Sequence, residues 1–306
     1  MSGTIDPQAS TRPSPRAEFV AERQERRRRA RRSCLIRGCA VPTILLIFLI
    51  LLSSIYFLWP GRTNILVLGI DRPPEGTWLG RSDTNVLATF IPLQSYVGML
   101  SIPRDLWVSI PGVGENRINT AHFFAEGEAV GQGPFAAIET VETNFGVDVD
   151  YYIRIRFEGF QEIVDAMGGL NIELDVPMGG YPPGKHHLDG EQALAFVRDR
   201  ENTDDFFRMN QGQFFFRSVL KQMLNPLSWP RIPAILAAIN RSVETNLPVW
   251  LWPRLGFALL RAGPDGIDSR TISREMTTSF LTNEGAQVLL PVWDQINPVL
   301  FEMFGQ

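Results

Sequence analysis

An uncharged run of about twenty residues, from Ala40 to Trp59, constrains this 306-residue chain more than any other feature. A helix of that length crosses the roughly 30 Å hydrocarbon core of a bilayer, and Tyr56 and Trp59 place interfacial aromatic rings at its far end. The run is too long for the apolar region of a signal peptide, and no small-residue cleavage pair follows it. The sequence therefore predicts one transmembrane signal anchor over residues 34–60, followed by the folded part of the chain.

The charges before this run predict its orientation. Residues 1–33 are rich in Ser, Pro, Arg and Glu and contain the basic run Arg26–Arg32, which is typical of a disordered tail or a frayed helix. Such a run is also found in nucleic-acid-binding tails, but basic residues that precede a membrane span are retained in the cytoplasm. We therefore expect a cytoplasmic basic tail over residues 1–33 and an extracytoplasmic domain over residues 61–306.

The composition of the outer part argues against a nucleic-acid partner. From Gly61 onward there are 19 basic and 29 acidic residues, a formal net charge of −10. The only cysteines, Cys34 and Cys39, precede this part, so no disulfide stabilises it, and its length is sufficient for one large core. In such an acidic domain a cluster of arginines is expected to have a specific anionic partner.

The hydrophobic pattern beyond Gly61 predicts strands that alternate with helices. Strands are predicted at 64–71, 85–91, 96–102, 106–110, 151–157, 170–176 and 267–272, and helices at 134–145, 160–167, 190–197, 208–224 and 284–303. The strand, helix and strand between 151 and 176 are typical of a sheet covered by helices on both faces. The predicted fold class is α/β, a three-layer α-β-α sandwich with a mixed central sheet, preceded by one transmembrane helix.

Two carboxylates lie at the ends of the first two predicted strands. The first strand ends in Asp71, and Asp83 precedes the second strand. Ligands bind at such strand ends, and one or two carboxylates completed by water and phosphate are the usual ligands of Mg²⁺. The two aspartates are therefore candidates to share a divalent cation. The alternative is that Asp83 caps a turn and that Asp71 pairs with Arg72 or Arg81.

A stretch after the helix predicted at 190–197 contains three arginines within eleven residues, Arg198, Arg200 and Arg208. In an extended exit from the helix Arg198 and Arg200 would project from one side, and paired guanidinium groups suit phosphate oxygens. The alternative is a solvated loop whose arginines pair with neighbouring acids such as Asp205. The adjacent histidines His186 and His187 lack a spaced third ligand, which favours a solvated Gly/Pro-rich loop over a metal site.

Six ordered motifs resemble the LytR-CpsA-Psr family, also called the cell-envelope-related transcriptional attenuator domain. They are Asn64–Asp71, Arg81–Thr84, Leu100–Asp105, Arg117–Asn119, Phe157–Phe160 and Leu188–Arg198. The resemblance runs from about Arg62 to the C-terminus and includes the preceding apolar run. It implies an extracytoplasmic phosphotransferase that moves a glycopolymer from a polyprenyl-pyrophosphate carrier to peptidoglycan through a phosphodiester bond.

The resemblance also implies roles for individual residues. Asp71 and Asp83 would hold Mg²⁺ or Mn²⁺. Pyrophosphate binding is expected from Arg81, Arg104, Arg117, Arg198, Arg200, Arg208 and Gln213. The catalytic set is expected to be Asp71, Arg81, Asp83, Arg104 and Asp205. Some of Phe207, Phe214, Phe215 and Phe216 are expected to line a slot for the polyprenyl chain.

This sequence departs from the family pattern at a few positions. Arg117 stands where Lys is commoner, His122 where Tyr is common, and Gln211 and Gly212 where the family usually has Arg and Gln. Two alternatives stay open: a hydrolase that cleaves polyprenyl pyrophosphates with the same groups, and a non-catalytic lipid-binding or regulatory envelope protein. Two carboxylates opposite so many arginines favour an enzyme.

Overall fold

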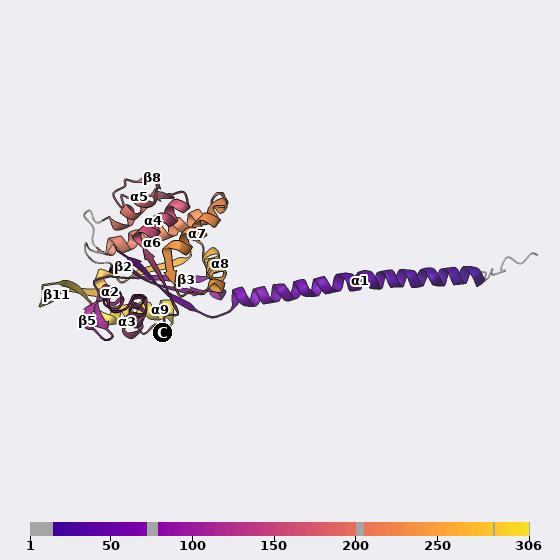
Figure 1. The fold of residues 1–306 in the computed structure, drawn as a ribbon, viewed down its shortest axis with the longest axis horizontal. Coiled ribbons are helices and arrows are strands. Elements are labelled where there is room, and N and C mark those ends of the chain that lie inside the picture. The colour runs from indigo at the N-terminus through magenta and orange to yellow at the C-terminus, as the bar shows by residue number, and fades with distance from the viewer. Residues whose placement is uncertain (1–14, 72–78, 200–204, 284, 306) are drawn as a thin grey trace, which may run out of the picture. The chain divides into compact units, whose positions relative to one another are not determined.

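The computed structural model describes residues 15–71, 79–199, 205–283 and 285–305, and Figure 1 shows the fold. For residues 15–18, 20–21, 27–41, 205–208 and 210 it describes the backbone alone. The chain divides into two compact units, Met1–Tyr56 and Phe57–Gln306.

The first unit is helical where it is described. Helix α1 (Pro15–Leu58) includes residues 15–33, for which the sequence predicts a disordered tail or a frayed helix. Runs of Arg, Glu, Gln and Ala have high helix propensity, and Glu22 pairs with Arg26 one turn later at 2.9 Å. Within the part of the chain that the structure describes, no helix combines the length and the apolarity that a bilayer crossing requires. The membrane span over residues 34–60 stays a prediction.

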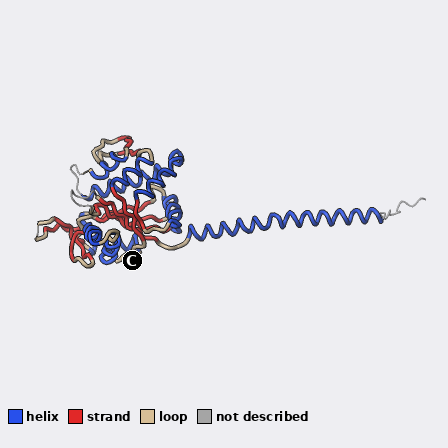
Figure 2. The backbone as a smooth tube through the Cα atoms, in the orientation of Figure 1, coloured by secondary structure: helices blue, strands red, loops and turns tan. Residues whose placement is uncertain are grey.

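The second unit is built on a mixed sheet of six strands in the order β10-β3-β2-β1-β6-β9. Figure 2 shows strands in red between helices in blue. The bounds of the six strands are β1 (Thr63–Ile70), β2 (Ser82–Ile91), β3 (Tyr96–Ile102), β6 (Tyr151–Arg156), β9 (Val243–Thr245) and β10 (Ile267–Thr271). Strand β1 is antiparallel to β2 and parallel to β6, and β3 is parallel to β10. The α/β class and the mixed central sheet are thus confirmed.

Helices cover both faces of this sheet, because successive strand residues point to opposite sides. On one face Leu66, Leu68 and Leu100 pack in a buried cluster with α2 (Asn119–Glu128), α3 (Gly133–Phe145) and α9 (Trp293–Phe304). On the other face Ile65 and Met99 pack with α6 (Asp205–Leu224) and α8 (Trp252–Ala262). A third cluster joins α6 to α4 (Phe157–Ala166), α5 (Gly190–Arg198) and α7 (Ile232–Ser242).

Three small hairpin sheets surround the central sheet. They are β4 (Trp107–Ile110) with β5 (Gly114–Arg117), β7 (Leu170–Leu174) with β8 (Gly184–Leu188), and β11 (Thr277–Leu281) with β12 (Gln287–Pro291). They correct three predictions. Strand β7 pairs with β8 instead of joining the central sheet. The last helix begins at Trp293, because β12 occupies part of its predicted length.

The third correction concerns the two histidines, which lie in β8 and not in a loop. The Nδ1 atom of His187 is 2.9 Å from Asn171 Oδ1 on the partner strand β7. The Nε2 atom of His186 is 2.8 Å from the Pro182 carbonyl. Both rings therefore take part in local hydrogen bonds.

Helix α5 begins as its sequence predicts. The Asp189 carboxylate accepts from the Gln192 backbone N–H at 2.8 Å, and the Gln192 side chain accepts from the Asp189 N–H at 3.1 Å. This reciprocal capping box satisfies two otherwise unpaired N–H groups. It fixes the start of α5, whose last residue, Arg198, is thereby positioned at the edge of the central sheet.

Candidate functional site

Charged residues from four neighbouring strands meet at one edge of the central sheet. Asp71 follows β1, Asp83 lies at the start of β2, Arg104 follows β3 and Arg156 ends β6. The register places these strand ends side by side, since Ile70 pairs with both Ser82 and Arg156, and Asn85 pairs with Ile102.

The backbone holds the two aspartates next to each other. The N–H groups of Asp71 and Asp83 both donate to the carbonyl of Arg81, at 3.1 Å each. Beside them, Gly80 passes so close that an added Cβ would lie 2.3 Å from the Asp71 carbonyl oxygen. Glycine is therefore required at position 80, and the spacing of the two carboxylates is set by main-chain hydrogen bonds.

Each of these carboxylates pairs with an arginine from another element. Arg104 Nη1 donates to Asp83 Oδ2 at 2.9 Å, and Arg198 Nη2 donates to Asp71 Oδ1 at 3.3 Å. The Arg198 guanidinium also lies 4.5 Å from the centre of the Phe157 ring, a stacking that orients it. Asp71 thus has a partner that is distant in the sequence, Arg198. Arg72, one of the two near neighbours considered as its partner, lies outside the described residues.

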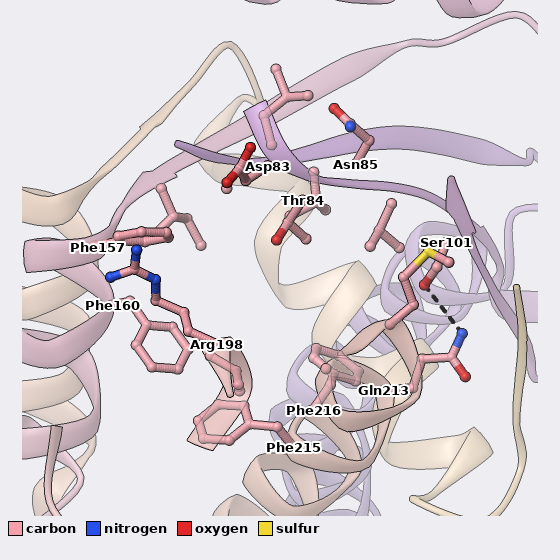
Figure 3. A pocket seen from close by; sticks show the side chains of 18 of the residues that line it. Asp83, Thr84, Asn85, Ser101, Phe157, Phe160, Arg198, Gln213, Phe215 and Phe216 are labelled. Carbon is pink, nitrogen blue, oxygen red and sulfur yellow. Dashed lines mark hydrogen bonds between the residues drawn. The ribbon is translucent and has the colours of Figure 1, made fainter. Parts of the chain in front are cut away.

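An apolar cavity of about 340 Å³ opens beside these pairs, and Figure 3 shows side chains from its wall. The charged part of the lining consists of Asp83, Arg104, Arg156 and Arg198. The remainder is largely apolar and comes from β1, β2, β3, α4, α5 and α6, including Val67, Val86, Met99, Phe157, Phe160, Phe215, Phe216 and Val219. A compact charged group and an apolar chain can therefore be bound side by side.

The phenylalanines of α6 divide between the cavity and the core. Phe215 and Phe216 line the cavity, as predicted for some members of this set. Phe214 packs in the cluster that α6 shares with α5 and lies 6.2 Å from the Phe196 ring. The side chain of Phe207 lies outside the described residues.

Gln213 lines the cavity, but its amide nitrogen forms hydrogen bonds with residues of β3 and β10. This nitrogen donates to the Arg270 carbonyl at 2.8 Å, to Thr271 Oγ1 at 3.1 Å and to Ser101 Oγ at 3.2 Å. The bond to Ser101 is the dashed line of Figure 3. Gln213 therefore ties α6 to β3 and β10, and its N–H groups are already used.

Arg81 and Arg117 lie near the site but do not line the described cavity. The Arg81 guanidinium is 5.5 Å from the centre of the Phe123 ring. Arg117 Nε is 3.2 Å from Asp105 Oδ1, and its Nη2 donates to the Gln287 carbonyl at 2.9 Å. The remaining predicted site residues are not described at the level of side chains: residue 200 lies outside the described ranges, and for residues 205 and 208 only the backbone is described.

A buried charged network lies behind the sheet edge, and the sequence analysis did not identify it. Arg154 of β6 is paired with Glu126 at 3.0 Å and with Glu244, and its Nη1 lies 3.1 Å from His122 Nε2. A guanidinium can only donate, so Nε2 accepts and the ring proton is on Nδ1. Burial, and then the positive charge of Arg154, lower the pKa of His122 to about 4, so this ring is neutral at physiological pH.

The donor set fits a weakly held Mg²⁺ ion better than a fully protein-ligated metal. Among the described residues no group of three or more His, Cys, Asp or Glu side chains could hold a metal ion. Asp71 and Asp83 offer two carboxylates at neighbouring strand ends, and Mg²⁺ commonly takes one or two carboxylates and fills its other positions with water and substrate phosphate. Two aspartates are therefore compatible with an ion that binds together with a phosphate ligand.

The chain is similar to a family model, to curated proteins and to solved structures. The model of the LytR_cpsA_psr family matches residues 59–297. A polyisoprenyl-teichoic acid–peptidoglycan teichoic acid transferase TagU of Oceanobacillus iheyensis is 37% identical over 190 residues, which are 60% of this chain and 58% of that protein. A TagU of Bacillus cereus is 36% identical over 191 residues, 60% of each chain. The chain thus spans about three fifths of the length of the curated relatives it matches.

Solved structures share the fold. Protein gbs0355 of Streptococcus agalactiae superimposes with a TM-score of 0.66 at 23% identity, covering 83% of this chain and 91% of that one. TagV of B. subtilis gives a TM-score of 0.64 at 24% identity, covering 80% and 98%. TagT bound to LIIa-WTA gives 0.61 at 22% identity, covering 80% and 91%. At these identities the similarity establishes the architecture.

Proposed function

Because the chain belongs to the LytR_cpsA_psr family, we propose that it transfers a glycopolymer from a polyprenyl-pyrophosphate carrier to peptidoglycan through a phosphodiester bond. The names of the relatives, transferases between polyisoprenyl-linked teichoic acid and peptidoglycan, support this assignment. The observation that carries it is the apolar cavity whose lining includes Asp83, Arg104 and Arg198. A lipid carrier has an apolar chain and a pyrophosphate, and this cavity offers a complementary environment for each.

The proposed reaction forms and breaks one bond at phosphorus. An acceptor hydroxyl oxygen attacks the phosphorus that bears the glycan, the bond from that phosphorus to the bridging oxygen breaks, and polyprenyl phosphate leaves with the electron pair. Arg104 and Arg198 would donate hydrogen bonds to the phosphoryl oxygens and stabilise the charge that spreads over them. Asp205 is our candidate to orient the arginines or to accept the hydroxyl proton.

Asp71 and Asp83 would hold Mg²⁺ or Mn²⁺, which when bound neutralises charge on the phosphoryl oxygens. In the structure each aspartate is paired with an arginine. A pyrophosphate at the mouth of the cavity would compete for Arg104 and Arg198. Ligand binding would therefore exchange two internal ion pairs for arginine–phosphate contacts.

We further propose that residues 34–60 anchor the protein in the cell membrane, with residues 1–33 in the cytoplasm and residues 61–306 outside. Two features support this orientation: the arginine run precedes the apolar run, and the large apolar side chains from Ile44 to Leu52 are exposed in the first unit. A reporter that is active only in the cytoplasm, fused after Gln306, should be inactive. An active reporter would exclude both the orientation and a cell-wall role.

The decisive experiment incubates the purified protein with a labelled lipid-linked glycan and Mg²⁺, with and without peptidoglycan oligomers. We expect label to appear on the oligomers and polyprenyl phosphate to be released in equal amount. Equally fast release without acceptor would instead identify a polyprenyl-pyrophosphate hydrolase. Binding without release would identify a non-catalytic lipid-binding or regulatory protein.

A further inference from the structure

Large apolar side chains are exposed around α8, close to the point where the chain enters the second unit. The patch consists of Trp59, Leu93 of η1 (Pro92–Gln94), Val249 and Trp250 of η3 (Val249–Leu251), and Leu260 of α8, and we call it the entry patch. Val249, Trp250 and Leu260 are 82%, 61% and 61% exposed. Apolar side chains gathered in this way mark an interaction surface, whereas single exposed ones do not.

Specific contacts join the segments of the entry patch into one surface. Arg254 of α8 is buried and its Nη2 donates to the carbonyls of Trp59 at 2.7 Å and Gly61 at 2.9 Å. The rings of Phe57 and Phe257 are 5.0 Å apart. At the other end of α8, Arg261 Nη1 donates to the Pro92 carbonyl at 2.7 Å, which fixes η1. Figure 1 places α8 on the side of the second unit where the chain enters.

The outer side of α8 is unusually apolar for a helix in contact with water. Pro253 and Leu260 are exposed and Phe257 is half-buried, at positions spaced by three and four residues that share one face. From Leu247 to Ala262 the sequence contains no acidic residue, although this unit has an excess of acids. A solvated helix would carry charged residues on that face.

The chain itself indicates what covers this surface. The residues that precede Phe57 are the apolar run Ile44–Ile55, so the patch is covalently continuous with the most apolar segment of the sequence. Trp59 and Trp250 are the residue type that concentrates at the boundary between lipid headgroups and acyl chains. We propose that the entry patch binds the surface of a lipid bilayer, with its apolar side chains in the headgroup region.

The same surface is connected to the candidate site. One buried cluster contains Leu251, Leu255 and Ala258 from the side of the patch, and Val67 and Phe216, which line the cavity, pack against it. A bilayer at the entry patch would therefore lie next to the packing that supports the cavity wall. The inference rests on the membrane location proposed above, and it extends the proposed function by making the bilayer surface part of how a lipid-linked donor is delivered.

A depth measurement on the full chain tests the proposal. In a background of Cys34→Ser and Cys39→Ser, an environment-sensitive fluorophore is attached at Trp250→Cys or at Val249→Cys, and the protein is reconstituted in phosphatidylcholine–phosphatidylglycerol vesicles. The control is Phe301→Cys, because Phe301 is 66% exposed on α9, which packs on the opposite face of the sheet.

We expect a blue-shifted emission and quenching by lipid-borne nitroxides at positions 249 and 250, and neither effect at 301. Equal behaviour at all three positions would overturn the proposal. A blue shift at 249 and 250 that depends on protein concentration and resists the lipid quencher would also overturn it, because it would identify a second copy of the chain as the occupant. The use of two neighbouring label positions protects against the failure of one variant to fold.

A second measurement separates this proposal from the transferase itself. Trp250→Ser and Val249→Ser should slow transfer from a long-chain donor embedded in vesicles several-fold and leave transfer from a short-chain, water-soluble donor unchanged, with Phe301→Ser as the control. Wild-type rates on both donors would show that the patch takes no part in delivery. Absence of transfer by the wild-type protein from either donor would count against the proposed function, while the depth measurement would still test the patch.

Discussion

At the scale of residues, the candidate site contains aspartates and arginines that form ion pairs with each other. Asp83 with Arg104 and Asp71 with Arg198 are partly buried pairs at the cavity mouth. Removing one partner changes the charge balance of the site in opposite directions. Asp83→Asn removes a carboxylate from Arg104, which still lies 3.4 Å from Asp105, whereas Arg198→Ala removes a cation from Asp71. The aspartate and arginine variants are therefore expected to fail in different ways.

Asp71→Asn and Asp83→Asn should abolish most transfer and weaken Mg²⁺ binding while the fold is kept, since both residues lie at strand ends outside the apolar clusters. Calorimetric titration with Mg²⁺ in the presence of a pyrophosphate analogue, together with turnover, measures both effects. Wild-type turnover by these variants in excess chelator would show that the two aspartates do not bind a catalytic metal ion and have structural roles alone.

Arg198→Ala should lower both the affinity for a lipid pyrophosphate and the rate. A charge-assisted, bidentate hydrogen bond contributes about 1.5 to 3 kcal/mol to binding, so its loss should weaken the affinity by roughly one to two orders of magnitude. Arg198→Lys should recover part of the loss, because an ammonium group supplies the charge without the fork. The matched control is Arg241→Ala on α7, since Arg241 is also exposed and loosely paired, at 3.8 Å from Glu162, but lies outside the cavity lining. Wild-type affinity of Arg198→Ala for the lipid pyrophosphate would contradict the proposed role of Arg198 in pyrophosphate binding.

His122 makes the stability depend on pH in a definite direction. Its pKa is about 4 in the folded protein and about 6.5 in an unfolded chain, so the unfolded state binds the proton first. The contribution of neutral His122 to the free energy of unfolding is fully present above pH 6.5 and is lost as the pH falls toward 4. Between pH 7 and pH 5 this predicts a loss of about 2 kcal/mol of unfolding free energy. Denaturant unfolding of the wild type and of His122→Asn tests it: the variant should show a smaller pH dependence, and equal slopes would contradict the assignment.

How much of the site the sequence could predict differs from residue to residue. Asp71, Asp83 and Arg104 follow or precede strongly apolar strands, so their convergence at one sheet edge is a consequence of the strand pattern. Arg154 could not be assigned in this way, because its partners Glu126 and Glu244 come from other elements. An alternating strand indicates only that Arg154 lies on the opposite face from its apolar neighbours, and not that this face is buried.

At the scale of elements, long apolar strands and capped helices could be predicted, whereas short polar hairpins could not. Strands β1, β2 and β3 are buried along most of their length and have the expected apolar runs. Strands β8 and β11 are exposed over most of their residues, and within the described parts of the chain each forms a two-stranded sheet with its own hairpin partner. Their apolar pattern is therefore weak, since local pairing and not burial determines them.

The attachment of α6 to the sheet is open to a direct test through Gln213. Gln213→Leu removes three hydrogen bonds and leaves the Arg270 carbonyl and the hydroxyls of Ser101 and Thr271 without this donor. We expect a loss of about 1 to 3 kcal/mol of unfolding free energy, the cost of leaving buried polar groups unpaired. Lys221→Ala, at an exposed position of the same helix, should change it by less than about 0.5 kcal/mol. Equal stability of the two variants would mean that Gln213 is not a structural anchor.

At the scale of the whole molecule, the second unit has a core of its own. The three buried clusters are formed by residues after Phe57. A chain that begins at Phe57 should therefore keep cooperative unfolding. A chain that begins at Arg62 should be less stable by about 1 to 3 kcal/mol, because the buried Arg254 guanidinium loses the carbonyls of Trp59 and Gly61 as acceptors. Comparison of the two denaturant midpoints tests this, and identical midpoints would contradict it.

The order of the strands also has a consequence for when folding can finish. Strand β3 is paired with β10 more than 160 residues later, Arg62 donates to the Met303 carbonyl 241 positions away, and α9 supplies Ile296, Leu300 and Phe304 to the core. Contacts so distant along the chain are slow to form, since a long loop must close before they contribute. A nascent chain of this protein can already cover part of that sheet face with α2 and α3, but the part that α9 covers stays exposed until residues 293–304 have been made.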